Sequence, residues 1–202
     1  SGLADNTVVV WISDHGERLG SHGGMHKGLF PYDGSMRVPF IVNVPWAQNK
    51  GRVVTAPVSQ IDLVPTILDL CGVPQPEDPR VTPEQKAHLA PMPDPLPGES
   101  LKSVLLEGTA PERKKALVEY NQDTFHEYEN IQMRTLVTYR YKVCMFTPTR
   151  EVFLFDREKD PYELNNLVET EEGRKVLPEL LAELLDEINR TEPRMPRRFS
   201  GC

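Results

Sequence analysis

The chain has 202 residues, with 23 Lys and Arg against 30 Asp and Glu, so its net charge is −7. This charge argues against a nucleic-acid-binding protein that works through bulk positive charge. Hydrophobic residues make up 39% and charged residues 26% of the sequence, which predicts a globular protein with one large domain or two small ones. All apolar runs are far shorter than the roughly 18 residues needed to cross a bilayer, so we expect no membrane span.

Three widely spaced cysteines, Cys71, Cys144 and Cys202, fit neither a dense disulfide framework nor a zinc site, and we expect them to be reduced. The sequence begins with Ser1 rather than Met and soon enters the apolar run 7–12. Such a run is typical of a strand with neighbours on both sides. These features indicate a fragment or a processed chain and leave its localisation open.

The first predicted element is a central strand over residues 7–12, which ends at the sequence Ser-Asp-His-Gly of residues 13–16. In open α/β sheets, ligand-binding side chains collect at the carboxyl ends of strands. Residues 17–36 contain several glycines and show no period of 2 or 3.6. They predict a long ordered loop, and loops of this length usually have a function.

A second strand is predicted over residues 38–44, and apolar spacing predicts a helix over 61–71 that Gly72 ends. Between residues 73 and 99 there are eight prolines. Because proline breaks helices and sheet ladders, we expect an irregular connection there, with at most a short helix over 84–89.

Four short β-prone runs then predict an antiparallel meander. The runs cover residues 116–120, 133–139, 141–146 and 152–155. Apolar residues recur at helical spacing over 176–188, which predicts a helix that packs on this sheet with Leu185 in its apolar stripe and Glu187 on another face. The tail 194–202 has no period and is expected to be a solvated terminus or an arm that packs against a neighbour.

Asp14 and His15 stand together where the first strand ends. A carboxylate oxygen beside an imidazole nitrogen can ligate one divalent cation. An Asp that caps a turn, with His15 merely hydrogen-bonded, explains this pair equally well. Lys27, in the glycine-rich loop, can meet an oxyanion as a mobile point charge, although a lone Lys in a loop is more often simply solvated.

Several segments, in the same order along the chain, resemble the second half of a sulfatase of the alkaline-phosphatase superfamily. The segments are SDHGERLGSHG at 13–23, Lys27, YD at 32–33, MRVPFI at 36–41, QIDLVPTILDLCG at 60–72, VFLFD at 152–156 and DPYELNNL at 160–167. The resemblance therefore covers nearly the whole chain.

The resemblance implies an α/β fold of the alkaline-phosphatase type. Residues 1–72 would form the C-terminal portion of the α/β core, with a partial parallel sheet and helices. Residues 73–99 would be the proline-rich connection, 100–192 a small antiparallel sheet packed by the terminal helix, and 193–202 a tail. The implied activity is hydrolysis of sulfate esters, with a sulfated small molecule or glycan as substrate.

For the site, the resemblance implies that Asp14 and His15 bind one divalent cation, which is usually calcium in such enzymes. Lys27 would bind the sulfate group. A cation and an ammonium fixed in a shielded pocket stabilise the charge that develops on the sulfate oxygens during hydrolysis. His22 and His26 are weaker candidates for protonating the leaving group or holding the loop.

Sulfatases make their nucleophile, a formylglycine, from a Cys or Ser in a Cys/Ser-x-Pro/Ala-x-Arg motif, which none of the three cysteines matches. We expect the formylglycine and two further cation-binding aspartates in a missing N-terminal half. The chain alone is then expected to be inactive and to bind calcium weakly. Its partner would be that half, or a second copy.

Two alternative functions stay open on the sequence. One is a phosphonate monoester or phosphodiester hydrolase of the same superfamily, since the same scaffold and cation serve phosphoryl transfer. The other is a non-catalytic isolated module, whose bare sheet edge would favour self-association.

Overall fold

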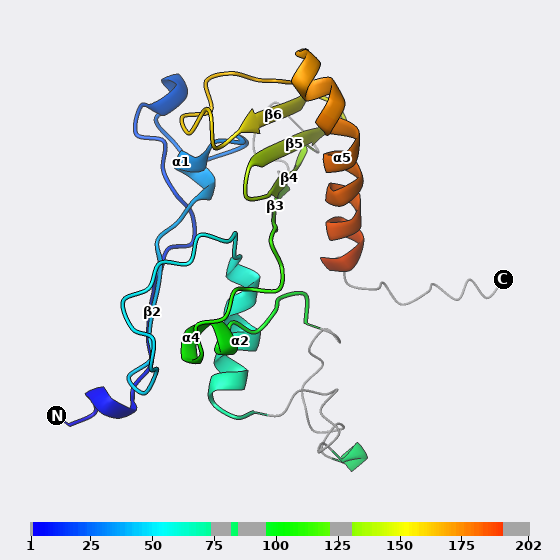
Figure 1. Cartoon of the computed structure of the whole chain (residues 1–202). Coiled ribbons are helices and arrows are strands. Elements are labelled where there is room, and N and C mark those ends of the chain that lie inside the picture. The colour runs from blue at the N-terminus through cyan, green and yellow to red at the C-terminus, as the bar shows by residue number, and fades with distance from the viewer. Residues whose placement is uncertain (1, 74–81, 85–95, 122–130, 192–202) are drawn as a thin grey trace.

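The structure, a computed structural model, describes residues 2–73, 82–84, 96–121 and 131–191. The predicted meander is confirmed as a four-stranded antiparallel sheet in the order β3-β4-β5-β6. Its strands are β3 Ala116–Asn121, β4 Gln132–Val137, β5 Tyr141–Thr147 and β6 Val152–Asp156. In Figure 1 this sheet lies between the long helix α5, Glu171–Thr191, and the short helix α1, Asp33–Met36.

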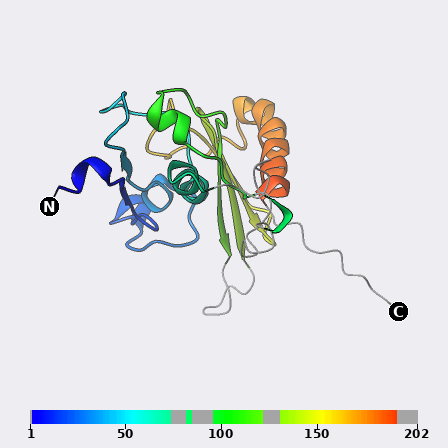
Figure 2. The same ribbon diagram turned by 90° about the horizontal axis from the view of Figure 1, so that it is seen from below.

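The helix α5 covers one face of the four-stranded sheet, as the sequence predicts. Its Leu180 and Leu184 are buried together with Leu136 of β4, Val143 of β5 and Leu154 of β6. Figure 2 shows α5 on one side of the sheet and the N-terminal segments on the other. The packing of α5 therefore accounts for only one of the two faces of this sheet.

The other face of the sheet buries part of the long loop that follows β1. Met133, Cys144 and Phe146 form a cluster there, and Leu29 and Met36 of the loop pack against it. Neighbouring residues of a strand point to opposite faces, so Val143 faces α5 whereas Cys144 faces the loop. Burial raises the pKa of the Cys144 thiol to about 12, so this cysteine is an inert hydrophobic residue, as expected.

Two expectations for the last helix are wrong. Leu185 is 57% exposed rather than part of the apolar stripe, whereas Glu187 is buried. In a helix each residue is rotated by about 100° from the one before it, so the face that contains Leu180 and Leu184 includes position 187 and excludes position 185. The buried Glu187 carboxylate pairs with Arg190 at 2.8 Å.

The two N-terminal strands pair antiparallel, which corrects the expectation of a parallel arrangement for this part of the sheet. They are β1, Val9–Ile12, and β2, Phe40–Asn43, with Ile12 opposite Phe40. A parallel pair needs a crossover that brings the chain back to the start of the first strand. The segment between β1 and β2 contains only short helices and returns at the end of β1 instead, so β2 runs backwards along it.

Short helices complete the described structure, and the predicted helix after β2 is confirmed. They are η1 Ala4–Asn6, η2 Ser21–Gly23, η3 Gln60–Asp62, α2 Leu63–Leu70 and α4 Lys102–Leu106. Ser59 and Asp62 form a reciprocal capping box at the start of η3, which satisfies the free N–H groups there. Cys71 follows the end of α2 and is exposed.

Some expectations fall on residues that the structure does not describe. They are the short helix over 84–89 beyond its first residue, the tail 194–202 and Cys202. Among the described residues, no helix combines the length and the apolar character that a membrane span requires.

The Asp156 carboxylate, which is 2% exposed, makes the stability of the sheet acid-sensitive. Burial alone would raise the pKa of Asp156, but Arg140, whose Nη2 donates to it at 2.8 Å, and two backbone N–H groups hold the pKa below its usual range. The carboxylate therefore contributes stability above about pH 4, and this contribution is lost as the pH falls through the lowered pKa.

We expect Asp156→Asn to lower the free energy of unfolding by about 2 kcal/mol at pH 7 and by much less at pH 3. Urea unfolding between pH 3 and pH 7 measures both values. Asp186→Asn is the matched control, because that carboxylate is exposed on α5 and its loss should change stability little. An Asp156→Asn difference that is the same at all pH values would contradict the argument.

Candidate active site

Asp14 and His15 lie directly beyond the end of β1, on the segment that leaves the two-stranded sheet. The distance from Asp14 Oδ2 to His15 Nε2 is 3.4 Å, and 83% of the Asp14 side chain and 39% of the His15 side chain are exposed. The carboxylate oxygen and the ring nitrogen therefore lie side by side at a surface that a ligand can reach.

Lys27 lies at the same place, although it follows His15 by twelve residues. Its Nζ donates to His15 Nε2 over 2.6 Å. The other ring nitrogen, Nδ1, lies 2.9 Å from the carbonyl oxygen of Gly16. That oxygen can only accept, so Nδ1 carries the hydrogen and Nε2 presents its lone pair to the ammonium. The structure thus brings all three predicted site residues together.

The charges of this group suit an anionic ligand that contacts both the Lys27 ammonium and a metal ion held by Asp14 and His15. The backbone N–H of His15 donates to Asp14 Oδ1 at 2.9 Å and lowers the pKa of the Asp14 carboxyl. Asp14 is therefore ionised at neutral pH, beside the Lys27 ammonium and the ring nitrogen Nε2 of His15. A carboxylate and such a nitrogen can hold a metal ion, and an ammonium can hold an oxyanion.

Gln60 is a further residue of the site, and the sequence analysis missed it. Its Nε2 donates to the carbonyl oxygens of Ser13 and Asp14, at 2.6 and 2.9 Å. These bonds fix the backbone that presents the Asp14 carboxylate. No local pattern in the sequence could reveal a contact between η3 and the end of β1, because it joins positions 46 and 47 residues apart.

The two weaker histidine candidates take part in the structure of the loop. The ring of His22 stacks on Tyr32, with centroids 3.6 Å apart and planes at 4°. The backbone carbonyl of His26 accepts from Arg18 Nε at 2.7 Å, and the same guanidinium lies 3.6 Å over the Phe30 ring. The first of these contacts favours a packing role for His22, and the second fixes the backbone next to Lys27.

At Gly16 the backbone of the site lies directly against α1. Its N–H donates to the carbonyl oxygen of Ser35 at 2.9 Å. A Cβ atom at position 16 would lie only 2.1 Å from the carbonyl oxygen of Gly34, so a larger residue would push α1 away. The glycine lets the backbone after His15 rest directly on α1.

The donor set fits one part of a divalent-cation site. Asp14 and His15 supply two adjacent ligands, but the described residues include no group of three or more His, Cys, Asp or Glu that could hold a metal ion. A calcium ion takes six to eight oxygen ligands. These residues could therefore hold such an ion only together with further ligands.

Comparison with protein families gives two matches along the chain. A family model described as Sulfatase matches residues 1–73. A second, described as N-sulphoglucosamine sulphohydrolase, C-terminal, matches residues 84–190. The first match contains Asp14, His15, Lys27 and Gln60, and the second contains the four-stranded sheet and most of α5.

Curated proteins and solved structures give the same family. An arylsulfatase of Clostridium perfringens is 32% identical over 95% of the chain, and an N-acetylglucosamine-6-O-sulfatase of Bacteroides thetaiotaomicron is 31% identical over 92%. The chain covers 35% and 30% of these relatives, so it spans about a third of their length.

Among solved structures, a protein in complex with its substrate D-glucosamine-2-N,6-O-disulfate matches with a TM-score of 0.76 and 29% identity, over 96% of this chain and 36% of that chain. A phosphonate monoester hydrolase of Agrobacterium radiobacter matches with a TM-score of 0.74 and 26% identity, over 95% and 36%. The fold is therefore shared with sulfatases and with a phosphonate hydrolase.

Proposed function

The chain belongs to the sulfatase family, and we propose that it forms the C-terminal part of an enzyme that hydrolyses sulfate esters. The observation that carries this proposal is the grouping of Asp14, His15 and Lys27, in which Lys27 Nζ lies 2.6 Å from His15 Nε2. The group combines two adjacent metal ligands with an ammonium that can bind an oxyanion.

In this proposal Asp14 and His15 bind a divalent cation, calcium, and Lys27 binds the sulfate group of the substrate. The bound cation would neutralise part of the sulfate charge and polarise its oxygens. Lys27 would hold another sulfate oxygen and stabilise the charge that gathers on the oxygens in the transition state. The Gly16 carbonyl holds His15 in the tautomer whose lone pair is on Nε2. Lys27, which donates to Nε2 in this structure, would release that lone pair to the cation and turn its ammonium to the sulfate.

The proposal assigns the nucleophile, a formylglycine, and the remaining cation ligands to residues outside this chain. The structure supports this proposal by making Cys144 a poor nucleophile. Its thiol is buried, and burial raises its pKa. A buried neutral thiol is a poor candidate for enzymatic oxidation.

We also propose the division of the chain into a core portion over 1–72, a connection over 73–99, a C-terminal subdomain over 100–192 and a tail. The apolar surface of the β1–β2 pair supports a partner for the core portion. Trp11 is 66% exposed, and Val9 and Ile41 are more than half exposed. Two strands alone are rarely stable, so we propose that further strands of the sulfatase core cover this pair.

The substrate class proposed is a sulfated sugar or a related small sulfate ester. Two relatives support a sugar: the N-acetylglucosamine-6-O-sulfatase, and the protein solved with D-glucosamine-2-N,6-O-disulfate as its substrate. The similarity to a phosphonate monoester hydrolase makes an aryl phosphonate the competing substrate to test.

The test is to measure hydrolysis of an aryl sulfate and an aryl phosphonate with calcium, by the chain alone and together with any segment encoded upstream of it. We expect sulfate hydrolysis only in the presence of that segment, and its loss when calcium is removed by a chelator. Size-exclusion chromatography of the same mixture should show the two segments eluting together. Preference for the phosphonate would favour the other hydrolase activity, and turnover by the chain alone would refute the proposed origin of the nucleophile.

A further inference from the structure

A buried charge cluster joins the four-stranded sheet to the loop that carries the candidate site. Lys142 of β5 is completely buried. Its Nζ donates to the carboxylates of Asp33 and Glu163 and, over 3.1 Å, to the carbonyl oxygen of Pro31. The second oxygen of Glu163 accepts from the backbone N–H of Asp33 at 2.7 Å. The start of α1 is therefore held by two side chains of the C-terminal subdomain.

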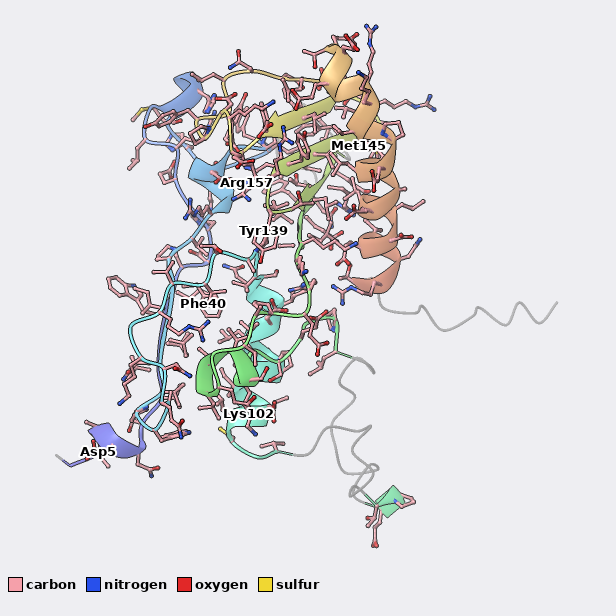
Figure 3. The ribbon with its side chains drawn as sticks, viewed as in Figure 1. Asp5, Phe40, Lys102, Tyr139, Met145 and Arg157 are labelled. Atoms are coloured by element: carbon pink, nitrogen blue, oxygen red, sulfur yellow. The ribbon has the colours of Figure 1, made fainter. Side chains whose placement is uncertain are left out.

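Stability alone is a weak explanation for this cluster. Removing charges from water is so costly that a buried ion pair is often no more stable than well-packed apolar side chains. Here two carboxylates share one buried ammonium, with Arg157 as a more distant partner, 3.9 Å from Asp33. Figure 3 shows Arg157 between α1 and the sheet. Unlike apolar packing, the hydrogen bonds of this cluster are directional, so they fix where residues 31–33 lie.

The position of α1 determines the position of His15. Asp33 begins α1, and Ser35 in the same helix accepts the N–H of Gly16 at 2.9 Å. The carbonyl oxygen of Gly16 in turn orients the His15 ring through Nδ1. No side chain separates Gly16 from α1, so a displacement of α1 moves the backbone beside His15 with it.

The same face of the sheet also supports the residues around Lys27. Tyr32, which carries the stacked His22, lies 6.0 Å from the ring of Phe155 on β6. Leu29, two residues after Lys27, packs on the cluster of Met133, Cys144 and Phe146. The loop is thus packed on the sheet just after Lys27 and is held by the charge cluster at Pro31 and Asp33.

We propose that Lys142 and Glu163 are positioning residues, which act through α1 to set the relative placement of His15 and Lys27. The four-stranded sheet is then part of the active-site scaffold rather than a separate packing unit. The expected effect on catalysis rests on the proposed function. The expected effect on structure concerns only how firmly residues 13–36 are held in place.

The test compares Glu163→Gln with Glu187→Gln in the full chain. Both carboxylates are 4% exposed and accept hydrogen bonds from cationic side chains, but only Glu163 contacts the loop. Hydrogen exchange of the Gly16 amide is the first measurement, and kcat and KM for aryl sulfate hydrolysis are the second. We expect Glu163→Gln to speed exchange of the Gly16 amide at least about tenfold more than exchange of the sheet amides. Glu187→Gln should speed exchange of the Gly16 amide and of the sheet amides by the same factor.

In the active enzyme, Glu163→Gln should also lower kcat/KM at least about tenfold, with less than a twofold change for Glu187→Gln. Equal effects of the two substitutions on Gly16 exchange would overturn the inference. If Gly16 exchange changes as expected but the unsubstituted enzyme does not hydrolyse the aryl sulfate, the proposed function is refuted and the positioning role stands. If Glu163→Gln does not fold, Asp33→Asn is the milder variant, because that side chain is 28% exposed, and the same pattern is expected.

Discussion

Replacement of Lys27 by Met is expected to lower kcat/KM for sulfate-ester hydrolysis by about 10²–10³-fold, while the free energy of unfolding stays nearly unchanged. The ammonium is exposed and lies 2.6 Å from His15 Nε2, where it can stabilise sulfate charge in the transition state. Removal of one such preorganised donor typically has an effect of this size. Steady-state kinetics with an aryl sulfate, in the calcium-loaded enzyme, measures the loss.

Lys50→Met is the matched control, because Lys50 is also exposed but lies in the loop after β2. It removes the same charge from the protein and should change kcat/KM less than twofold. A loss below about threefold for Lys27→Met, or an equal loss in both variants, would show that the ammonium does not contact the substrate. Calcium affinity should not decrease in Lys27→Met, since the ammonium repels the cation.

Replacement of Lys142 by Met should lower the free energy of unfolding by about 3–5 kcal/mol, the typical cost of leaving a buried charge without its partner. Met fills most of the volume of the Lys side chain, so the loss reflects the carboxylates of Asp33 and Glu163, which remain facing each other. Burial raises the pKa of Glu163 even with Lys142 present. Urea denaturation at pH 7 measures the change.

The loss in Lys142→Met should shrink as the pH falls. Without the ammonium, the native pKa of Glu163 rises further, so the native state binds protons more tightly than the unfolded state. At a pH below the pKa of Glu163 in the unfolded state, the carboxyl is protonated in both states and its burial costs little. This stabilising contribution is lost as the pH rises through the pKa of Glu163 in the native state. The double variant Lys142→Met, Glu163→Gln should be more stable than Lys142→Met, and a purely additive loss would contradict the charge argument.

Much of the fold follows from local patterns in the sequence. The β-prone residues of the short runs and the apolar period of α5 are properties of a few consecutive residues, so the meander and its helix could be predicted. The Asp14 and His15 pair at the end of a strand could also be predicted, since strand ends are where ligands bind in such sheets. Lys27 needed the family resemblance, because nothing local distinguishes it from a solvated loop lysine.

The direction of β2 and the burial of Lys142, which also escaped prediction, depend on distant parts of the chain. The antiparallel direction of β2 depends on how residues 13–39 turn back, and glycine-rich loops show no period that would reveal it. The burial of Lys142 depends on Asp33 and Glu163, 109 and 21 residues away. A lysine between tyrosine and valine in a strand is usually exposed, so only the fold shows that its face of the sheet is covered.

The link between Asp33 and Glu163 spans 130 residues, and this separation has a consequence for biosynthesis. A ribosome adds roughly 5–20 residues per second, so Asp33 emerges on the order of ten seconds before its partner exists. During that interval the loop after β1 can form its own turns, but its anchor on the sheet is still missing. Nascent chains therefore acquire an ordered loop around Lys27 only late in translation, after the last strand and the turn containing Glu163 have left the ribosome.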